Sequence, residues 1–423
     1  MHIVKELLEN VSTLKLNRFL NEHKITNEQN AQFPDQRVML ETFVLEGIIS
    51  IEDLNHFFYD ELLYGQHRLM RVYFLSAKTC SDLTRKETWT QFLKKFGIAD
   101  VDYNQIVETI PMRTESLKVA TMQEERVAGF LVKINIVFVF SMLKMTTQSV
   151  ETECSYIPVT IDLRERCLII KVWNQNGTTP DSRPTAQLDL VYNTLKESLE
   201  VENEKERDVD PQNVLYDMSK ELFNIFFERL PNIQEINGKR QQLGEVIDIL
   251  LRNIPLKHVK QKDGQLYMPE GIIDLEEELY KLIQQTALYD YREDYTLESL
   301  LPQEEKYVSK IRFSDRDNLS ANLMGENGVE CIYDTKTFMC IRDSLDIVQR
   351  IISLNVNFPR TRGMLQVKYE ADNYQYMTVH ILDGKYYTEA EFKEIWELYK
   401  EYERKRCYQT MHDNATATVT KAV

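Results

Sequence analysis

Glycine is scarce in this chain. The 423 residues include 13 glycines, about 3% against a usual value of roughly 7%. No Gly-x-Gly sequence occurs, and the closest pair is Gly325 and Gly328. Loops that cradle phosphate need glycines where backbone amides approach the anion closely. The sequence therefore excludes the dinucleotide-binding fingerprint and the Walker A loop.

Cysteine and histidine are also few and scattered. The six cysteines form no Cys-x-x-Cys pair, and no two of the seven histidines lie within five residues of each other. This excludes a zinc site encoded in one short segment, and we expect no cofactor and no metal. Carboxylates from distant segments could still converge on a metal ion. The chain starts as an amphipathic helix rather than a signal peptide, so we expect reduced thiols in the cytoplasm.

The charge balance is acidic. The net charge is −16, with 43% hydrophobic and 28% charged residues. This composition is ordinary for globular proteins, but the negative charge argues against binding of nucleic acid or anionic lipid by the whole surface. Only a local basic patch could provide such binding. No membrane partner is expected either, because the longest apolar run carries Lys133 and Asn135 and is shorter than the roughly 20 apolar residues of a membrane helix.

The clearest structural pattern lies between Arg126 and Asn174. Apolar residues alternate strictly from Phe130 to Met142 and again from Ile157 to Leu163, as expected for strands. Lys133 and Asn135 interrupt the opposite face, so the first half of the first run reads as a half-buried strand. The third run, 167–173, is apolar on both faces, as a central strand would be. These runs predict a three-stranded antiparallel meander against which the flanking helices pack.

Around this meander the sequence predicts an α+β multidomain protein. A helical domain is expected at 1–112, although 69–75 fits either a strand or a helix. The meander and a following helix occupy 113–200. An acidic linker and helices occupy 201–300, a two-layer α+β domain of the ββα type occupies 301–407, and a flexible tail covers 408–423.

Several helix boundaries can be read from capping residues. Ser50 is predicted to start a helix, and Thr84 and Thr388 each begin a Ser/Thr-x-x-Glu capping box. In the last domain, short strands are predicted at 310–313 and 328–333, followed by a helix through Ile351 and Ile352. A hairpin is predicted at 364–370 and 375–382, because Asp372-Asn373 is a turn signal.

One candidate catalytic site is a divalent-metal nuclease site. Restriction-type nucleases hold Mg²⁺ with an acid on one strand and an acid-x-Lys triplet on the next. Glu330 with Asp334 and Lys336 is the nearest match here. The alternative is ordinary surface charge, because a chain this rich in charged residues produces such triplets by chance.

The sequence also contains one set of residues for nucleophilic catalysis, Cys331, Cys340 and His380. A reactive cysteine needs a nearby cation or a helix N-terminus to stabilise its thiolate. Cys331 alternates as a strand residue and Cys340 lies on an apolar helix, so both are interpreted as small buried hydrophobic residues.

Two basic loops are candidate sites for phosphate or nucleic acid. Lys257, Lys260 and Lys262 form the first, and Arg360 and Arg362 the second. Arginine pairs on loops suit bidentate phosphate contacts. The alternative is that loop charges of this kind are simply solvated. Tyrosines around the 364–382 hairpin could stack bases, but cross-strand packing is the simpler interpretation.

Three functions follow from this reading. The first is a cytoplasmic, non-enzymatic interaction or scaffold component of a larger complex, with other proteins or further copies of itself as partners. The second is DNA or RNA binding through the basic loops. The third is a metal-dependent nuclease or phosphodiesterase. The missing catalytic motifs favour the first.

Overall fold

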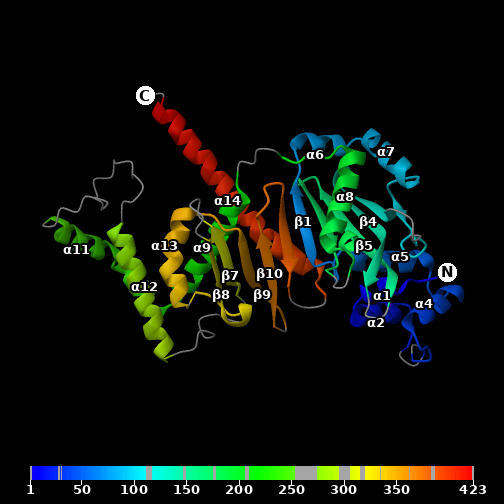
Figure 1. The fold of residues 1–423 in the computed structure, drawn as a ribbon, viewed down its shortest axis with the longest axis horizontal. Coiled ribbons are helices and arrows are strands. Elements are labelled where there is room, and N and C mark those ends of the chain that lie inside the picture. Colours follow the sequence, from blue (N-terminus) through cyan, green and yellow to red (C-terminus); the bar gives the residue numbers. More distant parts are fainter. Residues whose placement is uncertain are drawn as a thin grey trace. The chain divides into compact units, whose positions relative to one another are not determined.

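The computed structural model describes residues 2–421 apart from 27–28, 30, 111–116, 146–148, 175–177, 205–208, 253–273, 295–304, 315–319, 334, 362 and 383–385. The chain forms two compact units. Unit 1 comprises Met1–Gln212 and Leu365–Val423, and unit 2 comprises Asn213–Met364. Each combines helices with antiparallel strands (Figure 1), which confirms the α+β fold class. Unit 1 therefore takes its residues from both ends of the chain.

The described part of unit 1 contains eight strands. They are β1 (Leu69–Phe74), β2 (Tyr103–Asn104), β3 (Lys118–Val127), β4 (Phe130–Met145), β5 (Val150–Asp162), β6 (Cys167–Val172), β10 (Met364–Glu370) and β11 (Tyr376–Ile381). Their hydrogen-bonded order is β2-β3-β4-β5-β6-β1-β11-β10, and each neighbouring pair is antiparallel. β4, β5 and β6 confirm the predicted three-stranded meander. The segment 69–75, which fitted either a strand or a helix, forms strand β1.

One face of this sheet, called the first face, is covered by α6 (Ala77–Leu83), α7 (Lys86–Phe96) and α8 (Pro184–Leu199) (Figure 1). Ile134, Ile136 and Phe138 of β4 have no exposed surface and pack in one core with residues of these helices. Alternate residues of a strand point to the same face, so the alternation seen in the sequence directly produces this core.

The opposite face, called the second face, is partly covered by α1 (Lys5–Glu9), α2 (Thr13–Glu22), α4 (Gln36–Leu45) and α5 (Ile51–Leu62). Val137, Val139 and Tyr156 pack there in a second apolar core. The long helix α14 (Glu389–Lys421) also reaches this face, because Tyr369 Oη donates to the Ile395 carbonyl at 2.8 Å. α14 continues to Lys421 and therefore includes most of 408–423, the range predicted as a flexible tail.

Two of the predicted helix starts are confirmed. Ser50 Oγ accepts from the Asp53 amide at 2.9 Å. Thr388 Oγ1 accepts from the Glu391 amide, and the Glu391 carboxylate accepts from the Thr388 amide at 2.7 Å. The capping box at Thr84 is wrong. Thr84 ends α6, its hydroxyl donates to the Ser81 carbonyl, and α7 begins after Arg85 without a side-chain cap.

Unit 2 contains α9 (Pro211–Glu228), α10 (Pro231–Gly238), α11 (Arg240–Arg252), α12 (Leu275–Asp294) and α13 (Lys336–Val348). Its strands β7 (Tyr307–Ser314), β8 (Ser320–Met324) and β9 (Ser353–Pro359) have the order β9-β7-β8. The strand predicted at 328–333 is wrong, because a 3₁₀ turn (Glu326–Gly328) and a loop occupy that segment. The helix predicted through Ile352 ends at Val348, and β9 begins at Ser353.

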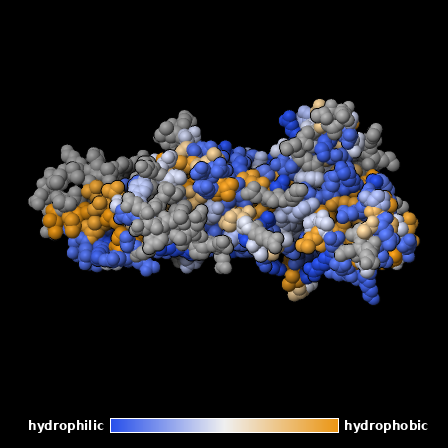
Figure 2. Space-filling view, turned by 90° about the horizontal axis from the view of Figure 1, so that it is seen from below, coloured by the Kyte–Doolittle hydropathy of each residue, from blue (hydrophilic) through white to orange (hydrophobic). Residues whose placement is uncertain are grey.

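Apolar side chains are exposed over α11 and α12 of unit 2. Val246, Ile249 and Leu282 are each more than half exposed, and Figure 2 shows orange surface over these two helices. Contiguous exposed apolar surface often marks an interaction site. Among the helices of the described chain, none combines the length and the apolar character that crossing a membrane requires.

Candidate functional site

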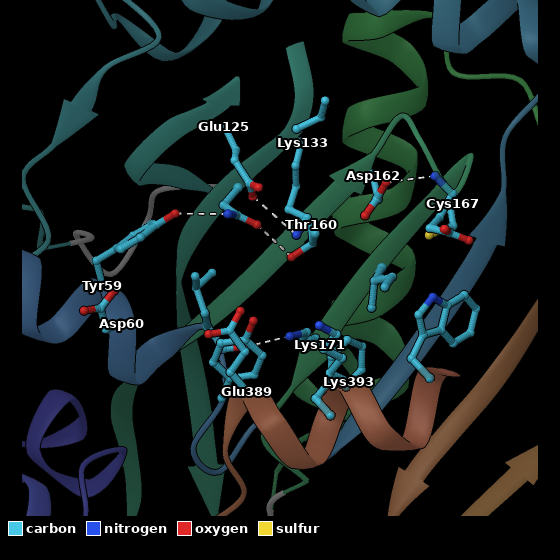
Figure 3. A pocket seen from close by; sticks show the side chains of 18 of the residues that line it. Tyr59, Asp60, Glu125, Lys133, Thr160, Asp162, Cys167, Lys171, Glu389 and Lys393 are labelled. Carbon is cyan, nitrogen blue, oxygen red and sulfur yellow. Dashed lines mark hydrogen bonds and ion pairs between the residues drawn. The ribbon is translucent and has the colours of Figure 1, made fainter. Parts of the chain in front are cut away.

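A polar cavity lies on the second face of the unit 1 sheet. Its volume is about 680 Å³, and its walls come from β3 to β6, from α5 and from the first turns of α14 (Figure 3). Seven carboxylates and five basic side chains line it. The carboxylates are Asp60, Glu61, Glu125, Asp162, Glu165, Glu389 and Glu397, and the basic side chains are Lys15, Lys133, Arg164, Lys171 and Lys393. This volume falls within the range of ligand-binding pockets.

The pairing register of β3, β4 and β5 determines which residues form the floor of the cavity. Lys133 of β4 pairs with Glu125 of β3 on one side and with Asp162 of β5 on the other. Two residues further along β4, Asn135 pairs with Thr160 of β5. Residues directly opposite each other on paired strands project to the same face. Residues separated by up to about 40 positions in the sequence therefore meet on one surface.

A chain of hydrogen bonds crosses this floor. Thr160 Oγ1 donates to Asn135 Oδ1 at 2.9 Å, and Asn135 Nδ2 lies 3.1 Å from the Tyr59 hydroxyl of α5 (Figure 3). Burial raises the pKa of Tyr59 to about 12, although the hydrogen bond to Asn135 lowers it. Tyr59 therefore stays neutral at physiological pH, and the chain ties α5 to the middle of the sheet.

Lys171 of β6 lies at the back of the cavity. It is 1% exposed, and its Nζ donates to the carbonyl of Leu63, just after α5, at 2.7 Å. Nζ also lies 4.3 Å from the centre of the Tyr64 ring and 4.4 Å from that of Phe392, as cation–π contacts require. Burial lowers the pKa of Lys171 to about 7.

Ion pairs hold some of the remaining charges. Lys15 Nζ lies 2.6 Å from the Glu61 carboxylate, and Lys133 Nζ lies 3.4 Å from that of Glu125. Burial raises the pKa of Glu61, and Lys15 opposes this shift. Burial also raises the pKa of Asp60. Partly buried carboxylates with raised pKa values are common at functional sites.

The arrangement is suited to binding a ligand that carries both signs of charge. Exposed rim residues of each sign, Arg164, Glu389 and Lys393, face the same space. Aromatic side chains of Tyr59 and Trp396 supply apolar contact beside them. Within the described ranges, no group of three or more His, Cys, Asp or Glu side chains is placed to hold a metal ion.

The residues suggested for a nuclease belong to unit 2 and do not line this cavity. Glu330 is exposed and follows the 3₁₀ turn. Lys336 is the first residue of α13, whose N-cap is Thr335, so a helix start rather than a strand carries it. Asp334 and the Lys336 side chain lie outside the described part of the structure. The nuclease therefore stays a prediction.

Of the basic residues in the two loops, only Arg360 lies in the described part of the structure. This half-buried residue follows β9, and its amide donates to the Gly363 carbonyl at 3.0 Å. Arg362 and the lysines Lys257, Lys260 and Lys262 fall in ranges that the structure does not describe. Nucleic-acid binding therefore stays a prediction, which a mobility-shift assay with Arg360→Glu at several salt concentrations tests.

The candidate nucleophile set is divided between the two units. Cys331 is buried in the loop after the 3₁₀ turn of unit 2, not in a strand. Cys340 lies on α13, also in unit 2, and its side chain is outside the described part. His380 lies on β11 of unit 1, where burial and the cations Arg68 and Lys368 lower its pKa to about 4.

Sequence reasoning missed the cavity, although a signal for it was present. Lys133 and Asn135 were recognised as polar interruptions of one strand face. Thr160, Asp162 and Lys171 are equivalent interruptions in the next two runs. If the meander is paired in its simplest register, these positions fall on one face, and that pattern would have identified the site.

No protein-family model, curated protein or solved structure matches this chain. The function must therefore be inferred from the chain itself.

Proposed function

We propose that this protein is a non-enzymatic interaction component of a larger cytoplasmic complex, and that its unit 1 cavity receives a short charged segment of a protein partner. The observation that carries this proposal is the lining of the cavity, with seven carboxylates and five basic side chains beside four aromatic residues. Surfaces of this kind favour partners whose charges alternate in the complementary order, since unmatched charges lose their hydration without compensation.

A protein segment fits this lining better than a single small ion. The charged rim residues come from separate elements, the β5–β6 turn and the start of α14. A ligand that contacts all of them must extend across the cavity. Tyrosine and tryptophan are enriched among the residues that contribute most to protein–protein binding, and Tyr59, Tyr64 and Trp396 line this cavity.

Two further observations support the proposal. The exposed apolar side chains over α11 and α12 of unit 2 provide a second surface for contacts in an assembly. The described cysteines, Cys80, Cys154, Cys167, Cys331 and Cys407, are all free thiols, which agrees with a reducing compartment such as the cytoplasm.

The test is a peptide-display selection on the full chain. Random linear peptides are selected on the wild type and then measured against Lys393→Glu, which reverses one exposed charge at the rim. The matched control is Lys78→Glu, an exposed lysine on α6 and outside the cavity lining. We expect charged peptides whose affinity falls at least about ten-fold with Lys393→Glu and is unchanged with Lys78→Glu. Equal affinity for all three proteins would place peptide binding outside the cavity and refute the proposal.

A further inference from the structure

The environment of Lys171 differs from that of an ordinary buried lysine. Its Nζ atom is held by one backbone carbonyl, that of Leu63, and by the faces of two rings, Tyr64 and Phe392. Within the described residues, no carboxylate oxygen lies within 4.0 Å of Nζ, in contrast to Lys15 and Lys400 of the same unit. Buried ammonium groups are usually paired with a carboxylate.

Burial disfavours the charged form of Lys171, and the nearby charges modify this effect. Lys133 on β4 repels a charge at Nζ, and Glu389 at the start of α14 is the one acid that favours it. His67, which is fully buried nearby, is itself kept neutral, with a pKa lowered to about 4. Burial is the largest effect, and together these groups set the Lys171 pKa at about 7. Near neutral pH, about half of the Nζ population is therefore a free amine.

We propose that Lys171 is a reactive amine, and that the cavity admits a small aldehyde with which Nζ forms an imine. The proposed reaction captures the aldehyde covalently in the cavity. It does not depend on whether a protein segment also binds there. The geometry on which it rests is an amine without a carboxylate partner among the described residues, on the lining of a cavity of about 680 Å³ and beside two rings that also line it.

The reaction needs no oxidant or reductant. The Nζ lone pair attacks the carbonyl carbon, a C–N bond forms, and one proton of Nζ passes to the carbonyl oxygen to give a carbinolamine. The second proton of Nζ then passes to the same oxygen, the C–O bond breaks, water leaves, and the nitrogen lone pair forms the C=N bond. The balance is one amine and one aldehyde giving one imine and one water. Ring faces stabilise a cation, so the Tyr64 and Phe392 rings suit the protonated imine as well as the ammonium.

The Phe392 ring is one of the two rings that cover Nζ, with its centre 4.4 Å away. This half-buried ring lies on the second turn of α14 and lines the cavity. Lys171 itself is only 1% exposed, so a reagent in the cavity reaches Nζ only when one of the covering rings, Tyr64 or Phe392, moves aside. Shortening residue 392 should therefore increase the rate of reaction at Nζ.

The experiment is reductive trapping on the full chain. The protein is exposed briefly to propanal and sodium cyanoborohydride between pH 6 and pH 9.5, and the label on each lysine is measured by peptide mass spectrometry. An ordinary lysine is neutral in about one molecule in 2,500 at pH 7. We expect Lys171 to label at least about ten-fold faster than exposed Lys78 at pH 7 and to reach a plateau above pH 8. Labelling of a lysine with an ordinary pKa keeps rising to pH 9.5.

Phe392→Ala provides the second measurement. It should speed labelling of Lys171 several-fold and leave that of Lys78 unchanged. The proposal is overturned if Lys171 labels no faster than Lys78 at pH 7 in both the wild type and Phe392→Ala. It is also overturned if its labelling rate continues to rise through pH 9.5, as for an ordinary amine.

Discussion

The two faces of the unit 1 sheet differ, although the same strands form both. One carries an apolar core, and the other carries an apolar core beside a polar cavity. On the first face, Ile134, Ile136 and Phe138 of β4 are fully buried in one continuous apolar core. On the second face, Val137 and Val139 enter a core with the N-terminal helices, whereas Lys133 and Asn135 line the cavity. The middle of β4 is therefore closed on the first face, whereas on the second face the strand is closed over only part of its length.

The difference follows from the cost of covering polar groups. An apolar helix surface laid over Lys133, Asn135, Thr160 and Asp162 would remove their hydration without supplying hydrogen bonds. The second face therefore closes where its residues are apolar, and a cavity remains where they are polar. Lys171 is the exception, because it is fully buried by the rings and the Leu63 carbonyl.

The largest effect should come from the closed face. Phe138→Ala removes a fully buried ring that packs edge-on against Phe92 and Phe96. We expect the free energy of unfolding to fall by about 3–5 kcal/mol, as measured by urea denaturation. Lys133→Ala, on the cavity side of the same strand, should cost less than about 1 kcal/mol. Equal losses for the two variants would contradict the distinction between the faces.

The next effect is a pH dependence that originates at Lys171. Between its folded pKa of about 7 and its unfolded value near 10.4, the unfolded state binds a proton that the folded state does not. The free energy of unfolding should therefore rise with pH between pH 7 and pH 10, by roughly 1 kcal/mol per pH unit from this group.

Urea denaturation of the wild type and of Lys171→Met at several pH values measures this gain. The variant should lack the additional slope, because methionine does not titrate. If Lys171→Met does not fold, the wild-type slope above pH 7 still tests the prediction. Parallel pH profiles for the two proteins would show that Lys171 keeps an ordinary pKa.

A smaller effect is expected from the hydrogen-bond chain on the cavity floor. Thr160→Val keeps the shape of the side chain but removes the donor to Asn135 Oδ1. The free energy of unfolding should fall by about 1 kcal/mol. Thr90→Val, on the exposed surface of α7, is the matched control and should change it by less than about 0.5 kcal/mol. No difference between these two variants would mean that the chain contributes nothing to stability.

The smallest change in stability should come from the rim of the cavity. Lys393→Glu alters an exposed side chain, so the free energy of unfolding should change by less than about 0.5 kcal/mol. Thermal unfolding measures this. The same variant is the one expected to weaken peptide binding at least about ten-fold. A large loss of stability would instead identify Lys393 as a structural residue.

The amino-acid sequence by itself determined the local elements of this protein. Two-residue alternation predicted the meander β4–β5–β6, and side-chain caps predicted the starts of α5 at Ser50 and α14 at Thr388. The alternation and the caps each depend on residues within a few positions of one another. They can therefore be recognised in a single segment of the sequence. The segment 328–333 was misread because a short apolar run also suits a buried loop.

Only the tertiary structure decided which segments meet. β1 pairs with β6 and also with β11, so that Leu69 lies opposite His380, and unit 1 is assembled from both ends of the chain. Periodicity gives the face of a side chain within its own strand but not the neighbouring strand or its register. The polar residues of the cavity were each visible in the sequence. Their convergence around Lys171, and the burial that lowers its pKa, follow from long-range pairing and from the packing of α5 and α14.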